Sequence, residues 1–427
     1  MSYSGYWGRC LEFLKKNNVE VGRLVRVQAE PSYHGIVMPR YEHSDDTHIV
    51  LKLKNGYNVG LEIEKISQIE VEPSPPARKE SPEHPHADTS LPKILLLSTG
   101  GTIASRIDYR TGGVTPALTA AELNASVPEL SQIANIDTEV LFSEYSENLM
   151  PEHWARIAER LNSCARSDYK GIIVAHGTDT MQYTAAALSF SLLGFPKPVA
   201  LVGSQRSSDR PSSDAATNLI SAARFLVSTD ATGFFVVMHN SSSDDEVACH
   251  WGTRVRKNHT SKRNAFQTVG GSPAFIIKND TIEKNALFCT PKREFAPRIS
   301  FNERVLLLKY FPGLDPEVMS RAVASGCRAI ILEGTGLGHV GKSMYEPIKA
   351  AKRKGLFVGM TSQCIDGSVR MTVYDSGRDL LSLGVVPLAD MIPETALVKA
   401  MWALGNAKDA GEMERLMREN LSFEISN

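Results

Sequence analysis

Two short runs of this sequence combine glycines with threonine hydroxyl groups. Thr99-Gly100-Gly101-Thr102 comes directly after the apolar run KILLLS, and His176-Gly177-Thr178-Asp179 comes directly after GIIVA. Ligands of open parallel sheets bind at the carboxyl ends of the strands, so we expect both runs at one edge of a sheet. The pattern indicates a site built from backbone amides, hydroxyl groups and a carboxylate.

The chemistry available to such groups is acyl transfer with a threonine nucleophile. Paired glycines let the backbone approach a ligand closely, with N–H groups that point outward as oxyanion donors. A Gly-Gly-Thr turn alone also occurs as an ordinary strand-to-helix connection. A threonine hydroxyl is too weakly acidic to attack an amide unaided and needs a base relay. The second run, with Thr178 beside Asp179, therefore makes the prediction of an amidase more specific.

A third run, from Gly336 to Ser343, matches the P-loop pattern G-x-x-x-x-G-K-S. It follows the apolar run AIILEG and precedes a helical stretch, as a P-loop does. A P-loop protein also needs a downstream strand that ends in Asp to hold Mg²⁺. Here the downstream run LFVGM is followed by Thr361-Ser362-Gln363. We therefore interpret the match as accidental, and a nucleotide-binding protein remains an alternative.

The composition is that of an ordinary globular protein. Of 427 residues, 42% are hydrophobic and 22% charged, and the formal net charge of −1 gives no sequence-wide attraction to nucleic acid. The six cysteines are scattered singly, which indicates reduced thiols rather than disulfides or a metal site. No apolar run reaches the ~18 residues of a membrane span, and the N-terminus lacks a secretory signal. We expect a cytoplasmic protein without membrane contact.

Residues 1–72 are expected to form a small accessory domain. An amphipathic helix is followed by short alternating runs that predict strands, and Asn55-Gly56 between two of them predicts a tight hairpin. These strands are expected to form a small β-barrel or a curled sheet. Residues 73–92 contain six prolines and few apolar residues, which is typical of an extended linker.

From residue 93 onward, fully apolar runs alternate with helical patterns. This alternation favours parallel strands joined by crossover helices, in an α/β architecture whose sheet is covered on both faces. A turn-rich stretch from about Ser272 to Arg304 indicates a boundary. The sequence thus predicts a larger catalytic α/β domain over 93–290 and a smaller α/β domain over 303–427.

The motifs T-G-G-T-I-A and H-G-T-D-T resemble the two signatures of the bacterial-type asparaginase and glutaminase family, and the likeness covers residues 93 to about 420. The resemblance implies a two-domain parallel-sheet fold with the active site at the carboxyl edge of the sheet. It implies that Thr102 is the nucleophile that forms an acyl-enzyme. Thr178, Asp179 and a lysine would form the relay, and Lys257 matches that lysine. The other interpretation of Lys257 is a solvated cation in a basic run.

The same resemblance assigns a lid and substrate contacts. Tyr109 lies in a polar segment that ends in two glycines and matches the lid tyrosine of the family, although an exposed loop tyrosine is the alternative. Substrate binding is implied for four residues, namely Gly101, Ser146, Glu147 and Gly177. Free-standing asparaginases tend toward Ser-x-Asp at Ser146, so Asn148 is a departure from the family. We interpret His176 as structural, because the chain has no G-x-S-x-G elbow.

The β-module and linker before the asparaginase-like part resemble the GatD family, the ammonia-releasing subunits of archaeal glutamyl-tRNA(Gln) amidotransferases. In that family, GatD releases ammonia from glutamine, and its partner GatE uses ATP to activate glutamate esterified to tRNA(Gln). The resemblance implies no cofactor on this chain, ATP and Mg²⁺ in GatE, Glu-tRNA(Gln) held mainly by that partner, and a homodimer of this chain within a D2E2 heterotetramer. A free-standing cytosolic L-asparaginase with an extra domain is the alternative.

Overall fold

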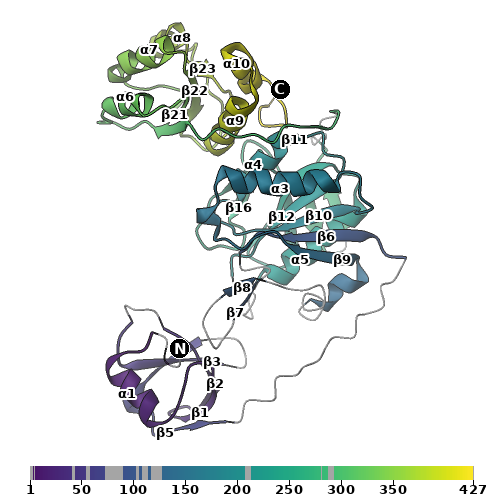
Figure 1. Cartoon of the computed structure of the whole chain (residues 1–427), viewed down its shortest axis with the longest axis vertical. Helices are drawn as coiled ribbons and strands as arrows, with labels where there is room; N and C mark the ends of the chain where they lie inside the picture. Colours follow the sequence, from purple (N-terminus) through teal and green to yellow (C-terminus); the bar gives the residue numbers. More distant parts are fainter. Residues whose placement is uncertain are drawn as a thin grey trace.

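The computed structural model contains a β-rich N-terminal module and two α/β domains (Figure 1). It describes residues 3, 5–40, 44–53, 58–72, 90–101, 105–107, 114–116, 127–206, 213–279, 281–286 and 293–426. Among these residues, no helix is both long and apolar enough to cross a bilayer.

The N-terminal module is an antiparallel sheet with strand order β4-β3-β2-β1-β5. Its strands are β1 (Leu24–Gln28), β2 (Tyr33–Val37), β3 (His48–Leu53), β4 (Asn58–Glu62) and β5 (Gln68–Val71). Helix α1 (Gly8–Lys16) adds Cys10 and Leu14 to a core that includes Val25 and Ile49. Because β3 and β4 pair antiparallel, with Lys52 opposite Asn58, they are the two arms of the expected hairpin. The Asn55-Gly56 turn itself lies outside the described residues.

The larger α/β domain is built on an eight-stranded sheet with strand order β18-β17-β14-β13-β12-β10-β6-β9. Its strands are β6 (Lys93–Ser98), β9 (Asn135–Val140), β10 (Gly171–Ala175), β12 (Pro198–Val202), β13 (Gly233–His239), β14 (Glu246–Trp251), β17 (Phe275–Lys278) and β18 (Thr281–Lys284). Five neighbouring strands are parallel, namely β9, β6, β10, β12 and β13. Strands β14, β17 and β18 extend the sheet in antiparallel pairing. This sheet confirms the predicted α/β class.

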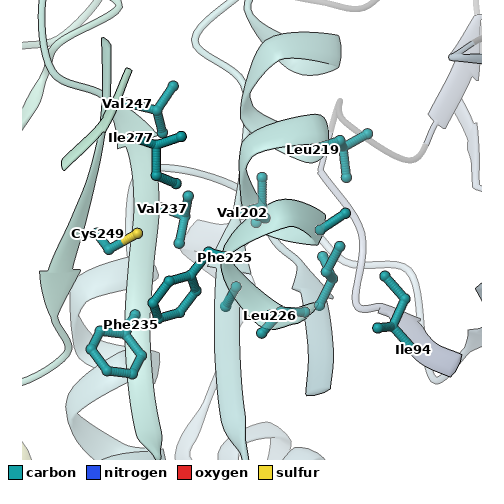
Figure 2. Close-up of a cluster of buried hydrophobic side chains, with 14 of the residues drawn as sticks. Ile94, Val202, Leu219, Phe225, Leu226, Phe235, Val237, Val247, Cys249 and Ile277 are labelled. Atoms are coloured by element: carbon teal, nitrogen blue, oxygen red, sulfur yellow. The ribbon is translucent and has the colours of Figure 1, made fainter. Parts of the chain in front are cut away.

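Helices cover both faces of this sheet, which explains why its central strands are apolar throughout. Alternate residues of β6 enter opposite cores, because successive side chains of a strand point to opposite faces. Ile94 belongs to the core on the side of α5 (Ala215–Ser228), where Phe225 packs against the sheet (Figure 2). Leu95 belongs to the core that contains apolar residues of α3 (Pro151–Cys164) and α4 (Met181–Ser191).

The smaller α/β domain has a parallel sheet with strand order β20-β21-β22-β23. Its elements are β20 (Val305–Lys309), α6 (Glu317–Ala324), β21 (Ala329–Gly334), α7 (Tyr345–Arg353), β22 (Phe357–Ser362), α8 (Asp375–Ser382), β23 (Val386–Pro387), α9 (Pro393–Asn406) and α10 (Ala410–Arg418). Helices α6, α7 and α8 contribute to the core on one face, and α9 and α10 to the core on the other. Helix α4 is buried along nearly its whole length, polar residues included, because it lies between the large sheet and α9.

The remaining described elements are short. They are β7 (Ser105–Ile107), β8 (Val114–Pro116), β11 (Leu192–Leu193), β15 (Val255–Lys257), β16 (Phe266–Thr268), β19 (Ala296–Pro297) and the 3-10 turns η1 (Ile63–Lys65), η3 (Pro128–Gln132), η4 (Ser146–Asn148) and η5 (Lys342–Met344). The stretch after Ser272 is not purely turn-rich, as its sequence suggested, because β17 and β18 lie within it. Strand β18 is largely exposed, so its sequence carries little apolar signal.

Candidate active site

The first motif continues from β6 into a turn that only glycine accommodates. Thr99 ties this turn to the end of β10, because its backbone N and its Oγ1 both donate to the carbonyl of Ala175, at 3.0 and 2.9 Å. Gly100 and Gly101 have φ values of +115° and +81°. A Cβ on Gly101 would lie 2.6 Å from the backbone nitrogen of Gly177. The two motifs are therefore in direct backbone contact at the carboxyl ends of β6 and β10.

A third segment, η4, lies against the second motif. A Cβ on Gly177 would lie 2.8 Å from the Cβ of Ser146, and Thr180 Oγ1 donates to the carbonyl of Ser146 at 2.6 Å. Ser146 is buried at this contact, while Glu147 and Asn148 are exposed. The structure thus brings Gly101, Gly177 and Ser146 together, three of the four predicted substrate-binding residues. Glu147 follows on the exposed side of the same turn.

Lys257 reaches the second motif from β15. Its Nζ donates to Thr178 Oγ1 at 2.8 Å and to Asp179 Oδ1 at 2.6 Å. The Lys257 side chain is only 9% exposed, whereas that of Asp179 is 67% exposed. Lys257 is therefore no solvated cation of a basic run. Because Thr178 Oγ1 accepts a hydrogen bond from Lys257, its O–H can still donate to a further acceptor, as a relay requires. The catalytic roles of these residues stay predictions.

His176 is fully buried and held from both sides. Its Nδ1 lies 2.6 Å from the carbonyl oxygen of Gly177 and its Nε2 lies 2.9 Å from Thr184 Oγ1. A carbonyl only accepts, so Nδ1 donates and Nε2 accepts from the threonine hydroxyl. Burial lowers the pKa of His176 from 6.5 to about 4, despite the opposing effect of the Gly177 carbonyl. This neutral imidazole fits the structural role that we predicted, with one backbone and one side-chain partner.

Buried histidines should make the fold less stable in mild acid. Burial also lowers the pKa of His250 from 6.5 to about 3. As the pH falls below 6.5, the unfolded chain binds protons that the native protein does not bind until about pH 3 to 4, so the free energy of unfolding decreases across this window. We expect His250→Gln to lose part of this decrease, measured as urea midpoints at pH 7, 5.5 and 4.5. If stability depended on pH equally in parent and variant, buried His250 would not be a cause of the loss of stability in mild acid.

Two predicted residues, Thr102 and Tyr109, lie outside the described residues. The described backbone on either side consists of Gly101 and of β7 and β8, which pair antiparallel, with Ile107 opposite Val114. The predicted nucleophile thus follows the glycine that contacts Gly177. The predicted lid tyrosine lies in the chain between two paired strands.

Known protein families match all three domains of the chain. Family models match residues 19–71 (GatD N-terminal domain), 93–287 (Asparaginase, N-terminal) and 304–417 (Glutaminase/Asparaginase C-terminal domain). The GatD subunit of the glutamyl-tRNA(Gln) amidotransferase of Pyrococcus furiosus is 47% identical over 98% of this chain and 98% of its own length. That of Sulfolobus acidocaldarius is 45% identical over 99% of this chain and 95% of its own length.

The chain belongs to the GatD family of glutamyl-tRNA(Gln) amidotransferase subunits. Its two α/β domains also resemble solved asparaginases. The thermostable L-asparaginase of Thermococcus kodakarensis superposes with a TM-score of 0.70 at 34% identity, over 78% of this chain and 99% of its own. L-asparaginase I of Vibrio cholerae gives a TM-score of 0.70 at 26% identity, over 79% of this chain and all of its own. The GatD family therefore shares the asparaginase fold, which confirms the predicted architecture.

The P-loop match of this GatD family member forms a different structure. A P-loop cradles phosphate with its backbone N–H groups. Here the N–H groups of Gly338 and His339 both donate to the carbonyl of Thr335, at 3.0 Å. Lys342 begins the 3-10 turn η5, and its side chain is exposed. This geometry lacks the phosphate cradle and supports an accidental match.

The loop after β12 also contributes to the site, and our sequence analysis did not identify it. A Cβ on Gly203 would lie 2.8 Å from Thr178 Cγ2. Asp214 is fully buried and holds this loop, because its carboxylate accepts from the backbone nitrogens of Gln205 and Arg206, both at 3.0 Å. A signal was available in the sequence, since this loop follows the apolar run PVALV, a third strand end beside the two motifs. Among the described residues, no group of His, Cys, Asp and Glu side chains is arranged to hold a metal ion.

Proposed function

We propose that this chain is the glutamine-hydrolysing subunit of a tRNA-dependent amidotransferase that converts Glu-tRNA(Gln) to Gln-tRNA(Gln). The observation that carries the proposal is the contact of Lys257 with Thr178 and Asp179, beside the backbone contact of Gly101 with Gly177. This contact supports a base relay at the carboxyl edge of the sheet, where an amidase needs one. The full-length similarity to GatD subunits supports glutamine rather than asparagine as the amide donor.

In the proposed mechanism, the Thr102 hydroxyl attacks the carboxamide carbon of glutamine. The C–N bond breaks, the proton from the hydroxyl passes to the leaving nitrogen, and ammonia departs from a glutamyl ester on Thr102. A water molecule then attacks this ester, and its proton passes through the Thr178 hydroxyl to Lys257, which acts here as a neutral amine. The ester C–O bond breaks and the proton returns to the Thr102 oxygen, which releases glutamate and restores the hydroxyl. Gly101, Gly177, Ser146 and Glu147 bind the amino acid. Asp179, largely exposed at the site, pairs with its ammonium group.

The acceptor half of the reaction belongs to a partner, GatE. GatE holds ATP, Mg²⁺ and most of the Glu-tRNA(Gln), and this chain binds no cofactor of its own. Its formal net charge of −1 is consistent with tRNA held elsewhere, because nucleic-acid affinity depends on cationic contacts with phosphate. The assembly is a cytoplasmic D2E2 heterotetramer in which this chain dimerises.

We expect glutamine hydrolysis by the chain alone to be slow, and to rise by roughly a hundredfold when GatE and Glu-tRNA(Gln) are both added. Ammonia is mostly protonated at neutral pH and is then not nucleophilic, so hydrolysis without an acceptor wastes glutamine. The measurement is glutamate release in three reactions, namely the chain alone, with GatE, and with GatE plus charged tRNA. Uncharged tRNA(Gln) is the control.

A free-standing asparaginase is the second candidate, favoured by the superposition on the Thermococcus kodakarensis enzyme. It predicts equal rates in the three reactions and faster turnover of asparagine than of glutamine. The same assays with asparagine therefore decide between the two functions.

A further inference from the structure

The last residues of the chain lie against the segment that leads to Lys257. In Figure 1 the C-terminus lies at the boundary between the two α/β domains. The carbonyl of Ser422 accepts hydrogen bonds from Trp251 Nε1 and from Thr253 Oγ1, the latter at 2.7 Å. The small domain adds Thr395, whose Oγ1 donates to the carbonyl of Thr253 at 2.8 Å. The turn between β14 and β15 is thus held by residues far along the chain.

Arg254 is the most extensively bonded residue of this contact. Its Nε donates to the carbonyl of Phe423 at 2.7 Å, its Nη1 to Asp390 Oδ2 at 2.7 Å, and its Nη2 to Ser426 Oγ at 3.1 Å. The Arg254 side chain is 5% exposed. Burial disfavours the charged form of Asp390, but hydrogen bonds from Arg254 and Ser426 outweigh it and hold the pKa of Asp390 below its usual range. Arg254 thereby joins the large domain, the small domain and the C-terminal segment.

The C-terminal segment is itself firmly anchored. Glu424 is fully buried and pairs with Lys399 of α9 at 2.5 Å. The same carboxylate accepts from the backbone nitrogens of Leu421 and Ser422, at 2.9 and 2.6 Å. The carbonyl groups that bind Trp251, Thr253 and Arg254 therefore belong to a segment with a fixed conformation.

Arg254 directly precedes β15, and Lys257 is the last residue of that strand. The carbonyl of Arg254 accepts from the backbone nitrogen of Val269 at 2.8 Å, which begins the pairing with β16. Strand β15 has only three residues and pairs with β16 alone in its sheet, so its position depends on this turn and on the ion pair of Arg256 with Glu394 of α9 at 3.1 Å. A shift of this turn would displace Lys257 Nζ from Thr178.

We propose that Arg254 is a positioning residue. Its hydrogen bonds to Asp390 and to the C-terminal segment fix the position of β15, and this position holds Lys257 against Thr178. This inference rests on the proposed function, in which Lys257 serves the base relay. It assigns to the small domain and the last residues of the chain a part in amide hydrolysis, although none of their described atoms is hydrogen-bonded to Thr178 or Asp179.

The test is a double-mutant cycle on the full chain, assayed as glutamine hydrolysis with GatE and charged tRNA. Lys257→Met should lower kcat by about 10²- to 10⁴-fold. Arg254→Met should lower kcat by about 10- to 100-fold with little change in KM, as expected when a catalytic group is misplaced by about 1 Å. In the double variant, the Arg254 substitution should add less than about threefold, because it acts only through Lys257. A multiplicative loss would overturn the proposal.

Arg160→Met is the matched control. It removes an ion pair of the same length, Arg160 with Glu139 at 2.7 Å, at the β9 edge of the large sheet. Its kcat should stay within about twofold of the parent. Full activity of Lys257→Met would instead show that Lys257 does not act in the relay of the proposed function. That outcome differs from one in which both single variants lose activity and their losses multiply in the double variant.

Milder variants keep the proposal testable if Arg254→Met does not fold. Asp390→Asn retains the side-chain volume but weakens the bond to Arg254, and Ser426→Ala removes one of its acceptors. Asp390→Asn should lower kcat, with the same non-additivity toward Lys257→Met. Unchanged kcat in both mild variants would overturn the proposal.

Discussion

Replacing Thr102 with alanine is expected to lower amide hydrolysis by about 10⁴-fold or more, as loss of a covalent nucleophile does in other acyl-transfer enzymes. Thr102 follows Gly101, which has a positive φ and lies against the backbone of Gly177 in the second motif. The acyl-enzyme cannot form without this hydroxyl. The measurement is single-turnover glutamate release, together with mass spectrometry of acid-quenched protein.

The parent should show a glutamyl adduct that the variant lacks. Thr281→Ala is a suitable control, because Thr281 is an exposed residue of the edge strand β18. It should keep both the adduct and the rate. If the rate of Thr102→Ala stayed within tenfold of the parent rate, another group would be the nucleophile. Unchanged thermal unfolding of the Thr102 variant would show that the loss is chemical.

The sequence predicted those parts of the fold whose signal is local. The runs KILLLS and GIIVA are apolar throughout because β6 and β10 are buried on both faces of the large sheet, and such runs identify central strands without further information. Strands β9, β14, β17 and β18 of this sheet were not predicted as strands. Strands β9 and β18 are the end strands and are less buried, so polar residues are tolerated at most of their positions. Strand β14 is buried but carries Glu246, His250 and two small residues in place of a continuous apolar run.

The site was predictable only in part, because its residues meet through the fold. Thr102 and Thr178 were identified from strand ends, which need no tertiary information beyond the parallel arrangement. Lys257 lies 79 residues from Thr178, and only family resemblance indicated it. Its approach depends on the turn at Arg254, which binds Phe423, 169 residues away. The spacing of residues in the sequence does not predict such a contact. The loop held by Asp214 was missed although it follows the apolar run PVALV, because this run is followed by no motif like those at the other two strand ends.

A buried ion pair near the C-terminus was not expected from the sequence either, since terminal residues are usually exposed. Lys399 and Glu424 are both fully buried and 2.5 Å apart. Lys399 Nζ also donates to the carbonyl of Glu419 at 2.6 Å. Replacing Glu424 with glutamine retains the volume but leaves a buried ammonium without a counter-ion. We expect the free energy of unfolding to fall by about 3–5 kcal/mol, the usual cost of removing one partner of a buried pair.

The pH dependence of this loss distinguishes an unpaired charge from lost packing. Burial lowers the pKa of Lys399 below its ordinary value of 10.5, and Glu424 opposes that effect. In Glu424→Gln the pKa of Lys399 should fall further. The cost of the buried charge is complete below this lowered pKa. It is relieved as pH rises toward 10.5, because the native protein then loses a proton that the unfolded chain keeps. Urea midpoints of parent and variant should therefore converge as pH rises toward 10.5, whereas a pH-independent gap would indicate packing. Asp230→Ala, which breaks the exposed pair with Lys170, should cost less than about 1 kcal/mol at every pH.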